Sequence, residues 1–256
     1  MSGLSVVSLR KSFGAVRAVD DVSFSVAGGE FLALIGPNGA GKSTCFNIIN
    51  GQLRPDAGAV RFEDGDLVKL PPSEICRRGI ARTFQIAATF GSMTVAENVQ
   101  MALIAHRREV YRLWRTATSF HRERALELLQ QVGMRDAADR PCRELAYGDV
   151  KRVELAVALA SEPRLLLMDE PTAGMAPRER NEMIALVKKL VVERGISVLF
   201  TEHSMDVVFA FADRIIVMAR GRLIADGDAK AVRNDPTVQQ VYFGSGRSFK
   251  LSEPKS

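Results

Sequence analysis

The stretch Gly36-Pro37-Asn38-Gly39-Ala40-Gly41-Lys42-Ser43 decides the interpretation of this chain. It follows a short apolar run at 31–35 and precedes helical apolar spacing at 42–50, which predicts a buried strand, a glycine-rich loop and a helix. Glycines let backbone N–H groups converge on phosphate oxygens that a Cβ would obstruct. Lys42 would add a point charge, Ser43 a hydroxyl for Mg²⁺, and the helix its positive end. The stretch therefore predicts a loop that binds nucleotide phosphates, rather than a glycine-rich structural turn.

Two further strands end in residues that can act on such a phosphate. The apolar run at 165–168 leads into Asp169 and Glu170. A buried strand ending in an acid is the expected Mg²⁺ partner of a phosphate loop, and a second carboxylate can polarise a water for attack on the γ-phosphate. His203 follows the strand expected at 196–201, at the end where α/β sheets bind ligands. These residues predict phosphate chemistry; the competing interpretation is an ordinary solvated acid pair.

Strand and helix patterns alternate along the second half of the chain. Strands are expected within the first thirty residues and at 31–35, 60–62, 165–168, 196–201, 215–218 and 223–225, the last two joined by a turn at Arg220-Gly221. Helices are expected at 42–50, 73–78, 97–108, 122–132, 150–160, 178–193 and 204–212. This alternation predicts an α/β fold with a parallel, helix-covered sheet.

Length and composition exclude several classes of protein. At ~150 residues per domain, 256 residues correspond to between one and two domains. Hydrophobic residues make up 46% and charged residues 25%, which excludes a disordered, collagenous or coiled-coil protein. No uncharged apolar run approaches the ~20 residues that cross a bilayer, and the N-terminus resembles no secretory signal, so we expect a cytoplasmic protein. The net charge of +5 favours no partner, and Cys45, Cys76 and Cys142 are expected to be buried or inert thiols.

Taken together, these residues resemble the ATP-binding-cassette (ABC) ATPases over nearly the whole chain. Beyond the phosphate loop, the resemblance rests on Gln85 in Arg-Thr-Phe-Gln, Leu-Ala-Tyr-Gly-Asp at 145–149, Met-Asp-Glu-Pro-Thr at 168–172 and Thr-Glu-His at 201–203. It implies an α/β fold: a P-loop (RecA-like) core with a mostly parallel sheet, an N-terminal antiparallel β subdomain and an inserted α-helical subdomain. We expect one domain at 4–243, the helical subdomain at about 86–160, and a frayed tail at 244–256.

The resemblance also implies roles for individual residues, with ATP and Mg²⁺ as cofactors. Glu170 would be the general base, His203 would contact the γ-phosphate, and Gln85 would sense Mg²⁺ and the γ-phosphate. The metal ligands would be Ser43, Gln85 and Asp169. Nucleotide would contact Phe13, which stacks on adenine, and Gly36, Pro37, Asn38, Gly39, Ala40, Gly41, Lys42, Ser43, Thr44, Ala146, Tyr147 and Gly148. Two cassettes would dimerise head to tail, each ATP lying between one phosphate loop and the other subunit's signature at 145–149.

A closer resemblance is to the longer ATPase subunit of branched-chain amino acid importers. It rests on residues 13–20, 93–99, 170–175 and 199–207 and on the extra segment around 107–121. This implies a peripheral subunit on the cytoplasmic face of the inner (plasma) membrane, with a second cassette (the same or different), transmembrane permease subunits and, indirectly, a solute-binding protein. The cargo would be branched-chain amino acids or related small polar solutes. A soluble single-cassette ATPase of cofactor assembly or nucleic-acid work, or a mainly ATP-binding regulatory cassette, are the alternatives.

The signature departs from the family's usual Leu-Ser-Gly-Gly-Gln. Ala146 replaces its serine, Tyr147 its first glycine and Asp149 its glutamine. Ala146 has no hydroxyl for a γ-phosphate, a hydrogen bond worth ~1.5–3 kcal/mol, although the helix opened by Gly148 still offers N–H groups. Ala176 replaces the aspartate that usually closes the loop after the catalytic glutamate, so its side chain cannot cap the helix that begins at Pro177.

A basic, aromatic segment around 107–124 allows two interpretations. Its residues are Arg107, Arg108, Tyr111, Arg112, Trp114, Arg115, Phe120, Arg122 and Arg124. Interleaved charge and aromatic rings are typical of nucleic-acid surfaces, but no recognition motif accompanies them. We favour a solvated helical hairpin and expect no nucleic-acid partner. His106 and His121 lack ligand partners at metal spacing and are expected at the surface.

Overall fold

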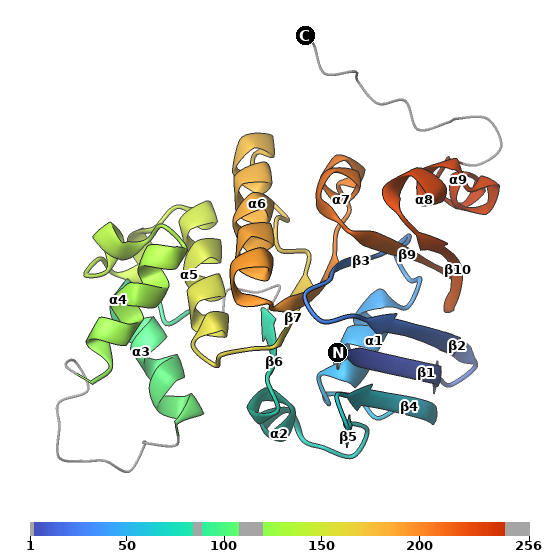
Figure 1. Ribbon diagram of the computed structural model, residues 1–256, viewed down its shortest axis with the longest axis horizontal. Helices are drawn as coiled ribbons and strands as arrows, with labels where there is room; N and C mark the ends of the chain where they lie inside the picture. Colours follow the sequence, from blue (N-terminus) through green and yellow to red (C-terminus); the bar gives the residue numbers. More distant parts are fainter. Residues whose placement is uncertain (1–2, 84–88, 108–119, 244–256) are drawn as a thin grey trace, which may run out of the picture.

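The computed structural model describes residues 3–83, 89–107 and 120–243. Within these ranges the chain forms two β-sheets with helices around them, and α1 (Lys42–Ile49) lies between the sheets (Figure 1). The expected combination of a mostly parallel sheet and a separate antiparallel sheet is therefore present. Gln85, most of the basic segment (108–119) and the tail (244–256) fall outside the described residues.

The antiparallel sheet has the strand order β2-β1-β4-β5. Its strands are β1 (Leu4–Phe13), β2 (Val16–Val26), β4 (Ala57–Phe62) and β5 (Gly65–Asp66). Alternate side chains of β1 and β2, such as Leu4, Val6 and Val22, are buried, which is the period of two that the sequence shows. The pair Phe13–Val16 closes the β1–β2 hairpin, with Gly14 at φ 59° in the turn. The hairpin thus presents Phe13 at its tip.

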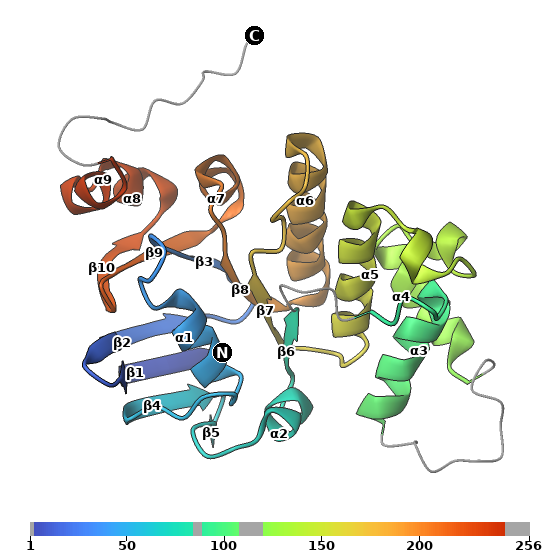
Figure 2. The ribbon, with the colours of Figure 1, turned by 180° about the vertical axis from the view of Figure 1, so that it is seen from behind.

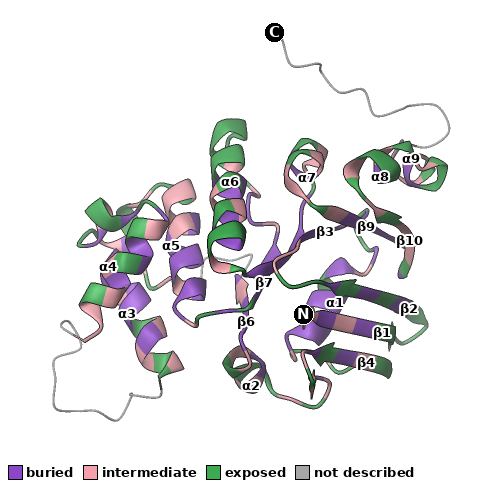
Figure 3. Cartoon of the chain, in the orientation of Figure 1, coloured by how far each residue is buried: buried purple, intermediate pink, exposed green. Residues whose placement is uncertain are grey.

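The second sheet has the order β10-β9-β3-β8-β7-β6 and is parallel except for β10. Its strands are β3 (Phe31–Ile35), β6 (Ile80–Thr83), β7 (Leu165–Asp169), β8 (Ser197–Thr201), β9 (Arg214–Ala219) and β10 (Arg222–Gly227). Every residue of β3, β7 and β8 is buried, as expected for a parallel sheet covered on both faces (Figure 3). The carboxyl ends of these three strands form one edge, here called the carboxyl edge.

The core divides into two clusters on opposite faces of this sheet. Leu32 and Leu34 of β3 join α1 and the antiparallel sheet in one cluster. Phe31, Ala33 and Ile35 join the helices in the other, where Phe31 stacks on Phe200 with ring centroids 4.4 Å apart. The alternation of side chains along β3 therefore fastens both layers to the strand that leads into the glycine-rich loop.

The helices lie near their expected positions, with a few corrections. Besides α1 they are α2 (Pro72–Arg77), α3 (Val95–His106), α4 (Arg122–Gln131), α5 (Tyr147–Leu159), α6 (Pro177–Arg194), α7 (Met205–Phe211), α8 (Ala229–Asn234) and α9 (Pro236–Phe243), with short 3-10 turns at Arg135–Ala137 and Cys142–Glu144. Helix α5 begins at Tyr147, earlier than expected, so the signature runs from just before its N-cap, Ala146, into its first turn. The strands β5 and β6 and the helices α8 and α9 were not predicted.

Helices α3, α4 and α5 form a separate group beside the sheet (Figures 1 and 2). Their inner faces are apolar, for example Val99, Leu128 and Val153. A capping box begins α3, since the Thr94 hydroxyl accepts from the Glu97 N–H at 3.2 Å and the Glu97 carboxylate from the Thr94 N–H at 2.8 Å. The division of the chain into a 4–243 domain with an 86–160 insertion stays a prediction.

The structure also places the lesser features of the sequence. The described arginines of the basic segment include Arg122 and Arg124, which pair with Asp139 at 2.6 Å and Glu127 at 2.7 Å, as in a solvated helix. His106 and His121 are half-buried rather than fully exposed. Cys45 and Cys142 are buried and Cys76 is half-buried. None of the described helices is both long and apolar enough to span a membrane.

Candidate functional site

The glycine-rich loop leaves β3 at Gly36 and enters α1 at Lys42. A Cβ on Gly36 would lie 2.2 Å from the carbonyl oxygen of Met218, and one on Gly41, at φ 105°, would lie 2.2 Å from that of Ala18. Side chains at these positions would collide with backbone, so the packed loop requires glycine at both. Gly39, at φ 78°, has open space where its Cβ would be. The loop is thus tightly anchored at its ends and open at its tip.

Lys42 points back into this loop. Its Nζ donates to the carbonyl oxygens of Gly36, at 2.6 Å, and Pro37, at 3.2 Å, and the residue is 7% exposed. Burial lowers the pKa of Lys42, and the nearby carboxylates of Glu170 and Asp169 partly oppose that shift. A phosphate in the loop would give the ammonium a charged partner in place of the carbonyls. Ser43 lies exposed in the first turn of α1, and Thr44 is half-buried beside it.

Asp169 is the last residue of β7 and is held from two sides. Its Oδ1 accepts a hydrogen bond from the Thr201 hydroxyl at 2.7 Å, and its Oδ2 pairs with Arg82 Nη2 at 3.1 Å. Asp169 lies opposite Thr201 in the parallel β7–β8 pair, which is why the hydroxyl reaches it. The Asp169 side chain is only 8% exposed. A buried carboxylate at the carboxyl edge is thus fixed in orientation.

Glu170 and His203 are in direct contact. Glu170 Oε1 lies 2.7 Å from His203 Nε2, and the two side chains are 22% and 50% exposed. Glu170 adopts φ 50°, a backbone conformation that costs a non-glycine residue ~1–3 kcal/mol. Its N–H donates to the carbonyl oxygen of Thr201 at 3.2 Å and to the Thr201 hydroxyl at 3.1 Å, which holds that conformation. The turn therefore aims the carboxylate at the histidine.

Glu202, to which the sequence analysis gave no role, ties together the loops that carry Glu170 and His203. Its buried carboxylate accepts hydrogen bonds from the N–H groups of Thr172, His203 and Ser204, at 3.2, 2.9 and 3.3 Å, and from the Thr172 hydroxyl. An acid directly after the apolar run at 196–201 was a usable signal, because Glu170 occupies the equivalent position after β7. Arg82 and Thr201 were likewise not assigned a role.

The remaining predicted site residues lie away from these. Phe13 is 52% exposed, and Lys11 Nζ lies 5.7 Å from its ring centroid. Ala146 is the N-cap of α5 and supplies no side-chain hydrogen bond, and Tyr147 packs beside Gly174. Figures 1 and 2 show α5 and α1 apart, with β7 between them. Within one chain the signature therefore meets the loop after Glu170, not the phosphate loop.

The N-terminus of α6 bears on the second departure from the family pattern. Ala176 is its N-cap and offers no side-chain acceptor, as expected. Instead the carboxylate of Glu179 accepts from the Ala176 N–H at 3.4 Å. This bond satisfies the N–H of Ala176 itself, whereas an aspartate at 176 would accept from an N–H in the first turn of α6, so it does not replace that cap.

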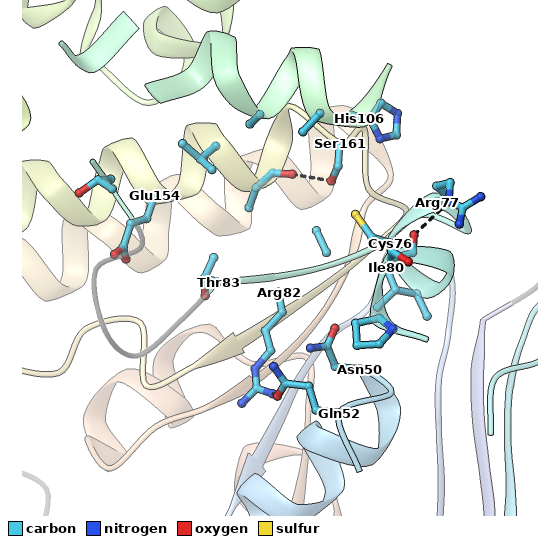
Figure 4. A pocket seen from close by; sticks show the side chains of 18 residues that line it. Asn50, Gln52, Cys76, Arg77, Ile80, Arg82, Thr83, His106, Glu154 and Ser161 are labelled. Carbon is cyan, nitrogen blue, oxygen red and sulfur yellow. Dashed lines mark hydrogen bonds between the residues drawn. The ribbon is translucent and has the colours of Figure 1, made fainter. Parts of the chain in front are cut away.

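A cleft of about 620 Å³ separates the β6–α2 edge from α3 and α5 (Figure 4). Its walls include Cys76, Ile80, Ala102, Ala105 and Val157. Arg82 and Gln52 point toward one another at one end of it. This cleft was not predicted, since it forms between elements distant in the sequence.

Comparison with known proteins assigns the fold and the site to a family. The model of the family described as ABC transporter matches residues 19–173. The chain belongs to the ABC transporter family. A second model, Branched-chain amino acid ATP-binding cassette transporter, matches residues 222–247 of the cassette. The family and the fold class expected from the motifs are therefore confirmed.

Individual relatives agree with this assignment. The cassette is 36% identical over 248 residues to the high-affinity branched-chain amino acid transport ATP-binding protein BraF of Pseudomonas aeruginosa, covering 94% of this chain and 97% of that one. It resembles the ADP conformation of MJ1267, an ATP-binding cassette of an ABC transporter, with a TM-score of 0.86, 36% identity and coverage of 95% and 99%. A dimeric cassette, MJ0796 bound to ADP and Pi, is 29% identical with a TM-score of 0.75 and coverage of 88% and 98%. The cassette is an ATP-binding ATPase subunit of a transporter.

Proposed function

We propose that this cassette hydrolyses ATP in a head-to-tail dimer on the cytoplasmic face of the membrane and so powers the import of branched-chain amino acids or related small polar solutes. The importer class is supported by the match at 222–247 and by the likeness to BraF. Separate permease subunits would carry the cargo across the membrane. A solute-binding protein would deliver the cargo to them.

The residues at the carboxyl edge fit a nucleotide with Mg²⁺. The open tip at Gly39 and the inward Lys42 suit phosphate oxygens. Mg²⁺ prefers oxygen ligands and is usually held by one or two carboxylates together with substrate phosphates. Asp169 and the Ser43 hydroxyl match that preference. When bound, the ion would neutralise charge on the β- and γ-phosphates.

Glu170 is the proposed general base. Its carboxylate would take the proton from the attacking water, and His203 would orient it through their 2.7 Å contact and reach the γ-phosphate. Gln85 keeps its proposed role as a sensor of Mg²⁺ and the γ-phosphate, and Phe13 as the adenine platform. The signature residues Ala146, Tyr147 and Gly148 would complete the ATP site of the partner cassette. The meeting of Glu170 and His203 beside the buried Lys42 is the observation that carries this proposal.

The test is Glu170→Gln, which keeps the shape of the side chain and removes the base. We expect MgATP binding to persist while steady-state ATP hydrolysis falls ~10²–10⁴-fold. In proteoliposomes holding the permease subunits and the binding protein, leucine uptake should be lost as well. Glu193→Gln, an exposed acid in the last turn of α6 that pairs with Lys189, is the matched control and should retain both activities. Hydrolysis by Glu170→Gln above about a tenth of wild type would contradict the assignment.

A further inference from the structure

Arg82 is a buried arginine next to the carboxylate expected to hold Mg²⁺, and the proposed function gives it no role. Its side chain is 10% exposed, and Nη2 lies 3.1 Å from Asp169 Oδ2. Nη1 donates to Asn47 Oδ1 at 2.7 Å and to Gln52 Oε1 at 3.1 Å. The guanidinium carbon lies 5.7 Å from the centroid of the Phe46 ring. Arg82 therefore joins the end of β7 to helix α1.

The charge of Arg82 affects how readily Asp169 can bind a metal ion. A carboxylate as buried as Asp169 is costly to leave without a counter-charge. With Oδ1 bonded to Thr201, the oxygen Oδ2 is paired with a fixed cation. A divalent cation arriving at the same carboxylate meets the positive charge of the guanidinium at close range, where repulsion is strong in a weakly polar interior. Mg²⁺ and Arg82 therefore draw on one negative charge.

We propose, on the basis of the proposed function, that Arg82 is a positioning residue that competes with Mg²⁺ for Asp169. In the metal-free cassette it neutralises and orients the carboxylate. When Mg²⁺ binds, the Arg82–Asp169 contact weakens while the bonds to Asn47 and Gln52 keep the guanidinium nearby. Asn47 lies one turn after Ser43 on α1, so Arg82 is anchored to the helix that supplies another expected Mg²⁺ ligand. Arg82 also lines the cleft between the sheet and the helical group (Figure 4). A change in the shape of this cleft would therefore alter the surroundings of the Arg82 side chain.

The first measurement is the effect of Mg²⁺ on ADP affinity, which needs no hydrolysis. The dissociation constant for ADP is measured by calorimetry in EDTA and in excess Mg²⁺. The value in EDTA divided by the value in Mg²⁺ reports the coupling between Mg²⁺ binding and ADP binding. Arg82→Met keeps an unbranched stem against Phe46 but removes the competing charge, and we expect the ratio to rise at least ~5-fold. Arg82→Lys keeps a cation and should stay near wild type. Arg77→Met, which lines the same cleft from an exposed pair with Glu74, is the control and should not change the ratio.

The second measurement is a double-mutant cycle on the metal-free, nucleotide-free protein, followed by urea unfolding. Arg82→Met should lower the unfolding midpoint in the wild-type background and much less in an Asp169→Asn background, where no buried charge is left unpaired. An equal drop in both backgrounds, or an unchanged ADP ratio, overturns the proposal, because Arg82 then acts through packing alone. If the wild-type protein itself binds no ADP, the proposed function fails, and the unfolding cycle still tests whether Arg82 neutralises Asp169.

Discussion

The hydroxyl of Thr201 should contribute measurably to both stability and catalysis. Thr201 is fully buried at the end of β8, and its hydroxyl donates to Asp169 Oδ1 at 2.7 Å and accepts from the Glu170 N–H at 3.1 Å. Thr201→Val replaces this hydroxyl with a methyl group of similar size. The Glu170 N–H keeps its bond to the Thr201 carbonyl, but Asp169 Oδ1 loses its partner.

The magnitude follows from those contacts. A hydrogen bond to a charged group contributes ~1.5–3 kcal/mol, and burial of the new methyl returns up to ~0.8 kcal/mol. The net loss in the free energy of unfolding is therefore about 1–2 kcal/mol, which a domain stable by ~5–15 kcal/mol survives. The Asp169 carboxylate is then held by Arg82 alone. We expect hydrolysis to be at least ~10-fold slower, because each ~1.4 kcal/mol added to the activation free energy lowers the rate ~10-fold.

Urea unfolding and steady-state ATP hydrolysis measure the two effects. Thr201→Ser is the matched control, because it removes the methyl and keeps the hydroxyl. It should lose some stability through the small cavity yet keep most of the activity. A valine variant as stable and active as wild type, or a serine variant as inactive as valine, would refute the reasoning, because the hydroxyl would then hold nothing in place.

Three other substitutions test the nucleotide contacts. Lys42→Ala should abolish measurable ATP binding in a filter or calorimetric assay. Unchanged affinity would show that the loop ending at Lys42 does not bind the phosphates of ATP. Phe13→Ala should weaken ATP binding by a factor that corresponds to ~1–3 kcal/mol of ring stacking, whereas Phe13→Tyr should not. Equal affinity of the wild type and both variants would show that Phe13 does not bind the adenine. Ala146→Ser restores the signature hydroxyl and should raise the hydrolysis rate of the isolated protein and its ATP-dependent dimerisation, the latter measured with Glu170→Gln; no gain in either would show that the hydroxyl is dispensable.

Much of the fold was predictable because it depends on local pattern. The buried runs before Gly36, Asp169 and His203 became β3, β7 and β8, and the long helices appeared close to their expected bounds. The missed elements are short. Strand β6 has four residues and includes Arg82, which interrupts the apolar run, and α8 and α9 have six and eight residues, too few to show a helical period. Their start signals were present, since Asp228 caps α8 through the Ala231 N–H at 2.7 Å.

The candidate site was predictable only as a list of reacting groups. A motif states which side chain performs which chemistry, but not which neighbour holds it. Thr201 reaches Asp169 because β7 and β8 are adjacent with those two residues in register, and Arg82 reaches it because β6 is the next strand. Strand order and register depend on contacts across long stretches of chain, which no local pattern specifies.

Residues such as Thr201 and Arg82, which hold a reacting group in place and are here called holding residues, determine which contacts nucleotide binding must replace. In the described structure Lys42 is bonded to loop carbonyls, Asp169 to Arg82 and Thr201, and Glu170 to His203. Binding of a nucleotide with Mg²⁺ would therefore exchange partners among groups that the nucleotide-free protein already holds in defined contacts. Loss of a holding residue should then disturb the nucleotide-free protein first, whereas loss of a reacting group should be felt only when nucleotide is present. The effects of Arg82→Met and Glu170→Gln on metal-free unfolding should differ in that sense, because one strands a buried carboxylate and the other removes a charge from a partly exposed one.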